Sequence, residues 1–497
     1  MWLILLLSLL VLIGCVALLK IVAWRRLVKR SAAIPTLSGW VPVMGHVQNL
    51  LQSQVKIAEF VDGIQKETRK RGGITTMWIG PLPTYLITDP DDALTLSNAC
   101  LKKPYIYNFL DAWLGNVCLL YSLPHKWRAQ RKQLNPFFNP RHLNGFLEVF
   151  NEQAAMLVNM FEPHVGGEAF DFKHYLVDIT LDTIKTNMFG RQEDTVGQNK
   201  CAYKEAIEDV LNIYMKRFSN IFLHSDLLYQ FTKSKGVEDK AVHLLQKTAS
   251  DALIKVKSAA TSEDQPSDKN FKPFVSLMLE LLEDGSLSEA EIQQHLDGFL
   301  FAGHDTSATQ LIYIFMAIGH YPEVQERIYK ELKEVLGDKP RAVTKEDLPK
   351  LVYLTAAIKE SMRLYPIAPV VMRDVDRDVK LKNVTLPSGT FAFILISGIN
   401  RSGVWGADAD QFDPGRWLEP ARLPASPAAF ATFSVGKRDC IGKTYAMMSM
   451  KTTIAHIIQN YRLKADINQL KCQLDVMLKP QSGCELSVEL RRTMSSS

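Results

Sequence analysis

The chain of 497 residues lacks the sequence features that mark several common classes of protein. Its seven cysteines are far apart and include no Cys-x-x-Cys pair, so we expect neither a disulfide framework nor a zinc site. It has no Gly-x-Gly-x-x-Gly fingerprint, which argues against a dinucleotide-binding domain of its own. The net charge of +5 is small for this length and is not gathered into a basic stripe. We therefore expect no nucleic-acid partner.

A long apolar run occupies the N-terminus. It covers residues 1–24 with an interruption at Lys20, and four basic residues follow between positions 25 and 30. A run of this length can cross a bilayer. A cleaved signal peptide is the alternative, but no basic region precedes the run and no small-x-small cleavage site follows it. We therefore predict one N-terminal transmembrane helix over residues 1–24, and the basic residues after it place the rest of the chain in the cytosol.

The remaining chain divides into a basic, proline-containing connector at 25–45 and one large domain at 46–497. β-Branched and aromatic residues at 74–79 and 84–88 predict a small hairpin. Helical periodicity dominates from about residue 90 onward. The polar stretch 258–269 predicts an exposed loop rather than a domain boundary. The fold class predicted from these patterns is mainly α with a small β-rich region.

Cys440 lies in the decapeptide Phe-Ser-Val-Gly-Lys-Arg-Asp-Cys-Ile-Gly, residues 433–442, ahead of a long apolar-periodic segment. A thiolate bound to iron needs backbone N–H groups turned toward the sulfur, and Gly436 and Gly442 permit the tight turn that this requires. Phe433 can shield the sulfur, and Arg438 can reach an anionic propionate group. The decapeptide therefore predicts a haem-thiolate loop in which Cys440 binds the metal.

The loop has two other interpretations. A lone cysteine in an intracellular protein is usually a buried structural thiol. Gly442-Lys443-Thr444 ends like a phosphate-binding P-loop, but five residues separate Gly436 from Gly442 where that motif has four, and no apolar strand leads into the loop. The spacing argues against nucleotide hydrolysis.

A long helix is predicted to begin at the capping box Ser288-Glu289-Ala290-Glu291 and to end at Tyr321-Pro322. Its middle holds the polar patch Gly303-His304-Asp305-Thr306 between apolar segments, and such a patch costs several kcal/mol unless its members find partners. The patch could be a set of satisfied core groups or a helix irregularity. Alternatively, Ala302 and Thr306, four residues apart on one face, could flank a bound dioxygen, with Asp305 supplying protons.

The pattern Phe-x-x-Gly-x-Arg-x-Cys-x-Gly resembles the haem-binding signature of the cytochrome P-450 superfamily. The segment 301–306 resembles the oxygen-activating helix of that family, and Glu360-x-x-Arg363 before Pro366 resembles its most persistent pattern. The resemblance covers essentially the whole chain. It implies a cytochrome P-450 fold and a non-covalent haem b, iron protoporphyrin IX, with Cys440 as the axial ligand.

The resemblance also implies roles for other residues. Glu360 and Arg363, which alone would suggest a solvated ion pair, would join Arg416 in a structural cluster. Propionate donors would be Trp127, Arg131, Arg373 and Arg438, although Trp127 and Arg131 alone would suggest a surface tryptophan beside solvated charge. Asp305 and Thr306 would relay protons. Five basic residues would lie on the cysteine side of the haem, where they would either steer an acidic reductase or be ordinary surface charge: Lys126, Arg128, Lys132, Lys437 and Lys443.

The implied activity is that of a haem-thiolate monooxygenase on a small apolar substrate. Electrons would come from NADPH through a separate flavoprotein reductase, with cytochrome b5 as a further donor, at the endoplasmic reticulum membrane. The chain looks most similar to the branch that contains fatty-acid ω-hydroxylases, so a fatty acid or other lipid is the expected substrate. Many members of that branch carry a glutamate where Ala302 stands, and Ala302 cannot form the ester that this glutamate forms with haem. The alternatives are a haem-thiolate isomerase or dehydratase acting on hydroperoxides, and a haem-binding protein without catalysis.

Overall fold

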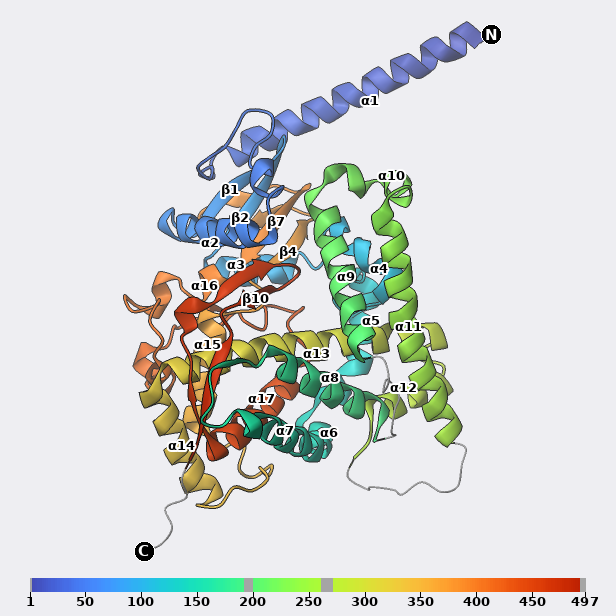
Figure 1. Cartoon of the computed structure of the whole chain (residues 1–497). Coiled ribbons are helices and arrows are strands. Elements are labelled where there is room, and N and C mark those ends of the chain that lie inside the picture. Colours follow the sequence, from blue (N-terminus) through green and yellow to red (C-terminus); the bar gives the residue numbers. More distant parts are fainter. Residues whose placement is uncertain (1, 192–199, 261–270, 492–497) are drawn as a thin grey trace, which may run out of the picture.

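The computed structural model describes residues 2–191, 200–260 and 271–491, and helices make up most of it (Figure 1). The α-helices are α1 (Trp2–Ser31), α2 (Gln54–Lys70), α3 (Pro90–Ala99), α4 (Asp111–Leu114), α5 (Pro124–Leu134), α6 (Pro140–Leu143), α7 (Leu147–Phe161), α8 (Lys173–Phe189), α9 (Lys200–Ser219), α10 (Asp226–Gln230), α11 (Lys233–Ala260), α12 (Phe274–Glu283), α13 (Glu289–His320), α14 (Pro322–Leu336), α15 (Val352–Leu364), α16 (Ile396–Ile399) and α17 (Lys443–Asn460). The strands are β1 (Ile74–Ile79), β2 (Leu82–Ile87), β3 (Phe170–Asp171), β4 (Val370–Val375), β5 (Val379–Lys380), β6 (Thr385–Leu386), β7 (Thr390–Leu395), β8 (Tyr461–Lys464), β9 (Lys471–Leu474), β10 (Leu478–Ser482) and β11 (Glu485–Leu490). A mainly helical fold with a small β-rich region is thereby confirmed.

The largest sheet has the order β1-β2-β7-β4. β1 and β2 form the predicted antiparallel hairpin, although β2 begins two residues earlier than its β-branched pattern does. β2 then pairs in parallel with β7, with Thr84 opposite Phe391, and β4 pairs antiparallel with β7, with Arg373 opposite Ala392. The sequence did not predict β4 or β7, and both come from the far end of the chain.

α13 crosses the middle of the molecule, as Figure 1 shows. Its first turn has the predicted capping box: the Ser288 Oγ accepts from Glu291 N at 3.3 Å, and the Glu291 carboxylate accepts from Ser288 N at 2.9 Å. The helix ends at His320, before the predicted stop. It packs closely on α8, because a Cβ added at Gly303 would lie 2.5 Å from Ile184 Cδ1. The 32 residues of α13 therefore form the axis around which the main core assembles.

A second apolar cluster lies against the middle of α13. Its buried members include Trp113 of α4, Tyr203 of α9, Leu245 of α11 and Phe301 of α13. The Trp113 and Phe301 rings meet edge to face, with centroids 5.1 Å apart. We call this set the upper cluster. It brings residues between 200 and 250, which sequence alone could not place, onto the polar part of α13.

α1 projects away from the other helices in Figure 1 and continues through the basic residues of the predicted connector to Ser31. Three polar contacts hold its end to the rest of the protein. Arg30 Nη2 lies 2.6 Å from Asp378 Oδ2, Trp24 Nε1 donates to Pro81 O at 2.8 Å, and the hydroxyl groups of Ser31 and Tyr85 lie 2.8 Å apart. In the described part of the chain, no helix has both the length and the apolar character needed to cross a membrane.

The first three residues of the loop predicted at 258–269 are helical, because α11 continues to Ala260. The remainder of that predicted loop lies outside the described residues.

Candidate active site

The decapeptide 433–442 forms a closed loop ahead of α17. Cys440 N donates to Phe433 O at 2.9 Å, and Asp439 N donates to Gly436 O at 3.1 Å. Gly436 has a φ of 77°, and a Cβ at this position would lie 2.8 Å from Ser97 Cβ. Only glycine therefore fits here, both for its left-handed backbone and for its close approach to α3.

The Cys440 side chain is accessible, yet it lies among dense protein surroundings. These surroundings desolvate the thiol and raise its pKa, while the backbone N–H of Gly442 donates to the sulfur and lowers it. The N–H group that a metal-bound thiolate requires is thus in place.

Three cations converge near this loop with little to neutralise them. Arg373 is fully buried and Arg438 is 8% exposed. Burial, together with the nearby charge of Arg373, lowers the pKa of Arg438 to about 9. Lys103 belongs to the same group, since burial, Arg373 and Arg438 together hold its pKa well below the usual range. No carboxylate among the described residues forms an ion pair with any of the three.

The guanidinium groups also have unused donors. Within the described residues, Nε and Nη2 of Arg373 and Nε and Nη1 of Arg438 are buried without a hydrogen-bond partner. Leaving such charged donors unsatisfied is costly unless an anion binds there. Lys103 escaped the sequence analysis because it lies in no recognisable motif.

Trp127 and Arg131 both lie on α5, as the spacing predicts, but they contact different groups. The Trp127 ring is buried beneath Arg438, whose Cζ lies 4.9 Å from the ring centroid. Arg131 instead donates to the loop: its Nη1 lies 2.7 Å from Asp439 O and its Nη2 lies 3.0 Å from Asp439 Oδ1. Its Nε donates to Asn135 Oδ1 at 2.8 Å, so in this arrangement each of these three nitrogens is engaged within the protein.

The residues of the polar patch of α13 lie in different environments. Ala302 is exposed on a helix that is otherwise largely buried, and the Thr306 hydroxyl donates to Ala302 O one turn earlier. Asp305 forms an ion pair with Lys479, with Asp305 Oδ2 2.7 Å from Lys479 Nζ. His304 is 3% exposed, and burial lowers its pKa to about 3. Neither ring nitrogen of His304 has a partner among the described residues, so the patch is not simply a set of satisfied core groups.

Glu360, Arg363 and Arg416 form a cluster with no exposed side-chain surface. Arg363 donates to both oxygens of Glu360 at 2.8 Å, and Arg416 Nε donates to Glu360 Oε1 at 2.9 Å. Asp413 N and Trp417 Nε1 each donate to the same carboxylate at 3.0 Å. One buried carboxylate thereby joins α15 to the segment 413–417.

The cluster is connected to the cysteine loop through Asn400. Arg363 Nη1 donates to Asn400 O at 2.9 Å. The Asn400 side chain accepts from Ala431 N at 2.9 Å and donates to Thr432 Oγ1 at 2.8 Å. These contacts fix the chain immediately before Phe433 and so position the loop that carries Cys440.

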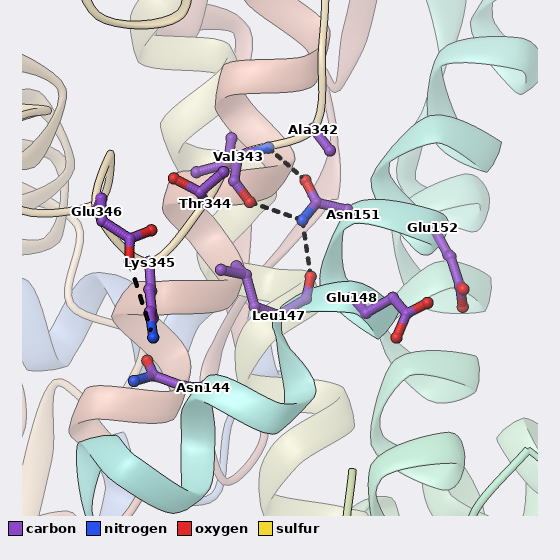
Figure 2. A pocket seen from close by; sticks show the side chains of 10 residues that line it. All are labelled: Asn144, Leu147, Glu148, Asn151, Glu152, Ala342, Val343, Thr344, Lys345 and Glu346. Carbon is purple, nitrogen blue, oxygen red and sulfur yellow. Dashed lines mark hydrogen bonds and ion pairs between the residues drawn. The ribbon is translucent and has the colours of Figure 1, made fainter. Parts of the chain in front are cut away.

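A separate pocket of 490 Å³ lies between α7 and the segment 342–346 (Figure 2). Asn151 links its two walls, because its Nδ2 donates to Val343 O at 2.9 Å and its Oδ1 accepts from Val343 N at 2.7 Å. None of the predicted site residues lines this pocket, so it plays no part in the site around Cys440.

Comparison with known proteins agrees with this geometry. The sequence model of the family Cytochrome P450 matches residues 35–487. The chain is 30% identical to Cytochrome P450 4V2 of Mus musculus over 95% of its own length and 92% of the relative's. It is 29% identical to Cytochrome P450 4c3 of Drosophila melanogaster, over 94% and 91% of the two chains.

The chain therefore belongs to the Cytochrome P450 family. Members bind haem b through a cysteine thiolate, and the protein is a haem-thiolate monooxygenase. The residues present suit this cofactor, because buried guanidinium groups with unused donors are the partners that two propionate groups require. No cluster of three His, Cys, Asp or Glu residues in the described chain could hold a metal ion. A single cysteine ligand to an iron held by a porphyrin is consistent with that finding.

Replacing Glu360 by glutamine should destabilise the protein by about 3–5 kcal/mol, because two buried arginines lose their common anion. Thermal or denaturant unfolding of the holoprotein measures the change. Glu419→Gln is the matched control: its carboxylate is 60% exposed and 3.6 Å from Arg422, so its loss should cost less than about 1 kcal/mol. Equal effects of the two substitutions would show that the buried cluster does not hold the fold.

Proposed function

We propose that the protein hydroxylates a fatty acid or other lipid at the haem bound by Cys440, with electrons delivered from NADPH by a flavoprotein reductase. In this reaction one oxygen atom of O₂ enters a C–H bond of the substrate, the other leaves as water, and NADPH supplies two electrons. The haem supplies the activation of oxygen when bound. The observation that carries the proposal is the closed loop of Cys440 beside two buried arginines with unused donors.

Arg373, Arg438 and Trp127 hold the propionate groups in this proposal, and Lys103 joins them. The pair Arg373 and Arg438 offers four nitrogen donors without a partner among the described residues, enough for bidentate contacts to carboxylates. Arg131 has its donors on Asn135 and Asp439, so its main contribution is to hold the cysteine loop. Gly436 and Phe433 shape that loop, and Gly442 N–H stabilises the thiolate charge.

The α13 residues face the substrate side of the haem in this proposal. Ala302 leaves room for the reacting end of the substrate, and the Thr306 hydroxyl lies one turn along the same face. Thr306 and Asp305 pass protons inward. Because alanine has no carboxylate to form an ester, the haem stays non-covalently bound.

A lipid substrate suits the upper cluster. The cluster is built from aromatic and aliphatic side chains of α4, α9, α11 and α13, and it lies against the polar patch. Similarity to the branch containing fatty-acid ω-hydroxylases points the same way. Binding of an apolar chain against this cluster would be stabilised by about 25 cal/mol for each Å² of apolar surface removed from water.

The membrane is the place where we propose the protein acts, with the N-terminal run 1–24 inserted in the endoplasmic reticulum membrane and the domain 46–497 in the cytosol. α1 projects from the domain, and α10 lies at the same upper edge in Figure 1. Large apolar side chains near α10 are exposed: Ile221, Phe222, Leu227, Leu228 and Phe231. Several exposed apolar side chains within one short segment favour contact with lipid.

The Cys440→Ser variant should lose the long-wavelength Soret band of the ferrous carbon monoxide complex, because the alcohol cannot act as the thiolate ligand. The difference spectrum of purified protein is the measurement. Cys201→Ser, which changes an exposed cysteine on α9, should leave the band unchanged. A band that survives in Cys440→Ser would remove Cys440 from the site.

Product formation from dodecanoic acid should require O₂, NADPH and the reductase together. Thr306→Ala should lower the ratio of product formed to NADPH consumed by about tenfold or more, since a positioned proton donor contributes a factor of ~10²–10⁴. Ser307→Ala on the same helix is the control and should behave like the wild type. Turnover of fatty-acid hydroperoxides without O₂ or reductase would instead identify an isomerase or dehydratase. No turnover of any kind, with Thr306→Ala indistinguishable from the wild type, would indicate a haem-binding protein without catalysis.

Deleting residues 2–24 should release the protein from microsomal membranes into the soluble fraction of an alkaline carbonate wash, whereas the full chain should stay in the pellet. The reason is that about 20 apolar residues are needed to span the hydrocarbon core. Western blotting of both fractions gives the result. Recovery of the full chain in the wash would contradict the anchor.

A further inference from the structure

Lys103 carries a charge that no residue in the described part of the chain neutralises. Its ammonium group forms no hydrogen bond or ion pair there. Burial, together with the charges of Arg373 and Arg438, holds the pKa of Lys103 well below its usual range, so the ammonium form is favoured only when an anion lies beside it. The residue stays partly accessible, whereas Arg373 is fully buried. A bound anion can therefore reach this lysine.

The backbone at Lys103 is fixed beside β4, the strand that carries Arg373. Lys102 O accepts from Asp374 N at 3.0 Å, which ties the chain to the strand just before the lysine. Pro104 follows the lysine, and its carbonyl oxygen accepts from Tyr107 N at 3.1 Å. Lys103 therefore keeps its place near Arg373 although its own side chain has no polar partner.

The ammonium group of Lys103 lies where the buried arginines meet the upper cluster. Its Nζ lies 4.9 Å from the centroid of the Tyr107 ring. Tyr107 belongs to the upper cluster and stacks on Tyr121, with centroids 6.4 Å apart. The Tyr107 hydroxyl accepts from Met372 N at 3.4 Å, one residue before Arg373. A ligand against the upper cluster can thus contact Lys103 as well.

Arg217 is the other cation over a ring of the upper cluster in the described part of the chain. Its Cζ lies 4.1 Å from the centroid of the Phe109 ring. Its charge is already paired, because Nη2 lies 2.8 Å from Asp226 Oδ1, and its Nε donates to Leu223 O at 3.2 Å. Of the two cations, Lys103 is the one that lacks an anion.

The charges of a bound haem would still leave one cation over. Ferric iron, the porphyrin dianion and the Cys440 thiolate cancel one another, so the two propionate groups carry the net charge. Arg373 and Arg438 match these two anions with their unpaired donors. Arg131 is already paired within the protein. Because an ammonium group has three N–H donors, Lys103 can share a propionate group and still bind a further carboxylate.

We propose that Lys103 binds the carboxylate of an acidic lipid substrate and so makes the protein select free acids over their neutral esters. This inference rests on the proposed function and names the head group of its substrate. The carboxylate supplies the missing anion while the apolar chain contacts the upper cluster. A hydrogen bond between two charged groups is about twice as strong as a neutral one. An ester has no charge to offer and leaves the ammonium group without an anion.

Lys103→Met should weaken the binding of dodecanoic acid by about tenfold to a hundredfold, but change that of methyl dodecanoate by less than about twofold. Titration of the Soret absorbance of the ferric holoprotein measures both affinities. Lys103→Arg, which keeps the charge, should restore the preference for the acid. Lys102→Met is the matched control. It removes the same charge one residue away, where the exposed ammonium group lies 2.7 Å from Asp374 Oδ2, and should leave the preference unchanged.

The rate of haem transfer to apomyoglobin separates this role from a structural one. Faster transfer from Lys103→Met, with equal losses of acid and ester affinity, would mean that the lysine serves only the propionate groups, and the inference would be wrong. It would also be wrong if Arg217→Met, and not Lys103→Met, abolished the preference for the acid, or if the wild type bound acid and ester equally.

The proposed function is tested separately, by turnover. If the wild type prefers the acid in the titration but forms no product that depends on O₂, NADPH and the reductase, the proposed function fails while Lys103 remains a carboxylate site. If it hydroxylates the ester as well as the acid and binds both equally, the proposed function holds and the role of Lys103 is rejected.

Discussion

The buried carboxylate of Glu360 is the interaction on which the site depends. It accepts hydrogen bonds from two fully buried arginines and from one indole and one backbone N–H that are partly buried. Such a charge is tolerated only when every donor is in place, so the segment 413–417 and α15 must be correctly packed together. Through Arg363 and Asn400, the same network fixes the residues that precede the cysteine loop. The geometry around Cys440 is therefore set by contacts far from the sulfur.

Much of this architecture could be predicted from the sequence where the signal is local. The capping box and the Tyr321-Pro322 stop gave both ends of α13, and the β-branched run gave the β1–β2 hairpin. The strand β7 could not be found in this way, because it pairs with β2, whose residues lie about 300 positions earlier in the chain, and β4 in turn pairs with β7. Local pattern also missed the continuation of α1 through its basic residues, since lysine and arginine are good helix formers.

For the site residues too, local patterns could be predicted from the sequence, whereas tertiary contacts could not. The spacing of Trp127 and Arg131 predicts one helix face, but only the structure shows that Arg131 has its donors on Asp439. Lys103 and Lys479 belong to no motif and lie near the site through tertiary packing alone. Asp305 was identified from its motif, whereas its ion pair with a lysine from the last hairpin could not be foreseen. Motifs thus identify reactive groups, and the environment that controls them comes from distant parts of the chain.

The parallel pairing of β2 with β7 has a consequence for synthesis of the protein on the ribosome. Thr84 cannot pair with Phe391 until Phe391 has been synthesised. At a translation rate of about 5–20 residues per second, synthesis of the intervening chain takes on the order of 15–60 s. During that interval β2 is an open strand edge, which is the kind of surface that pairs wrongly with other chains. If the N-terminus of the nascent chain were held apart from other nascent chains during this interval, the open edge of β2 would meet fewer strands with which it could pair wrongly.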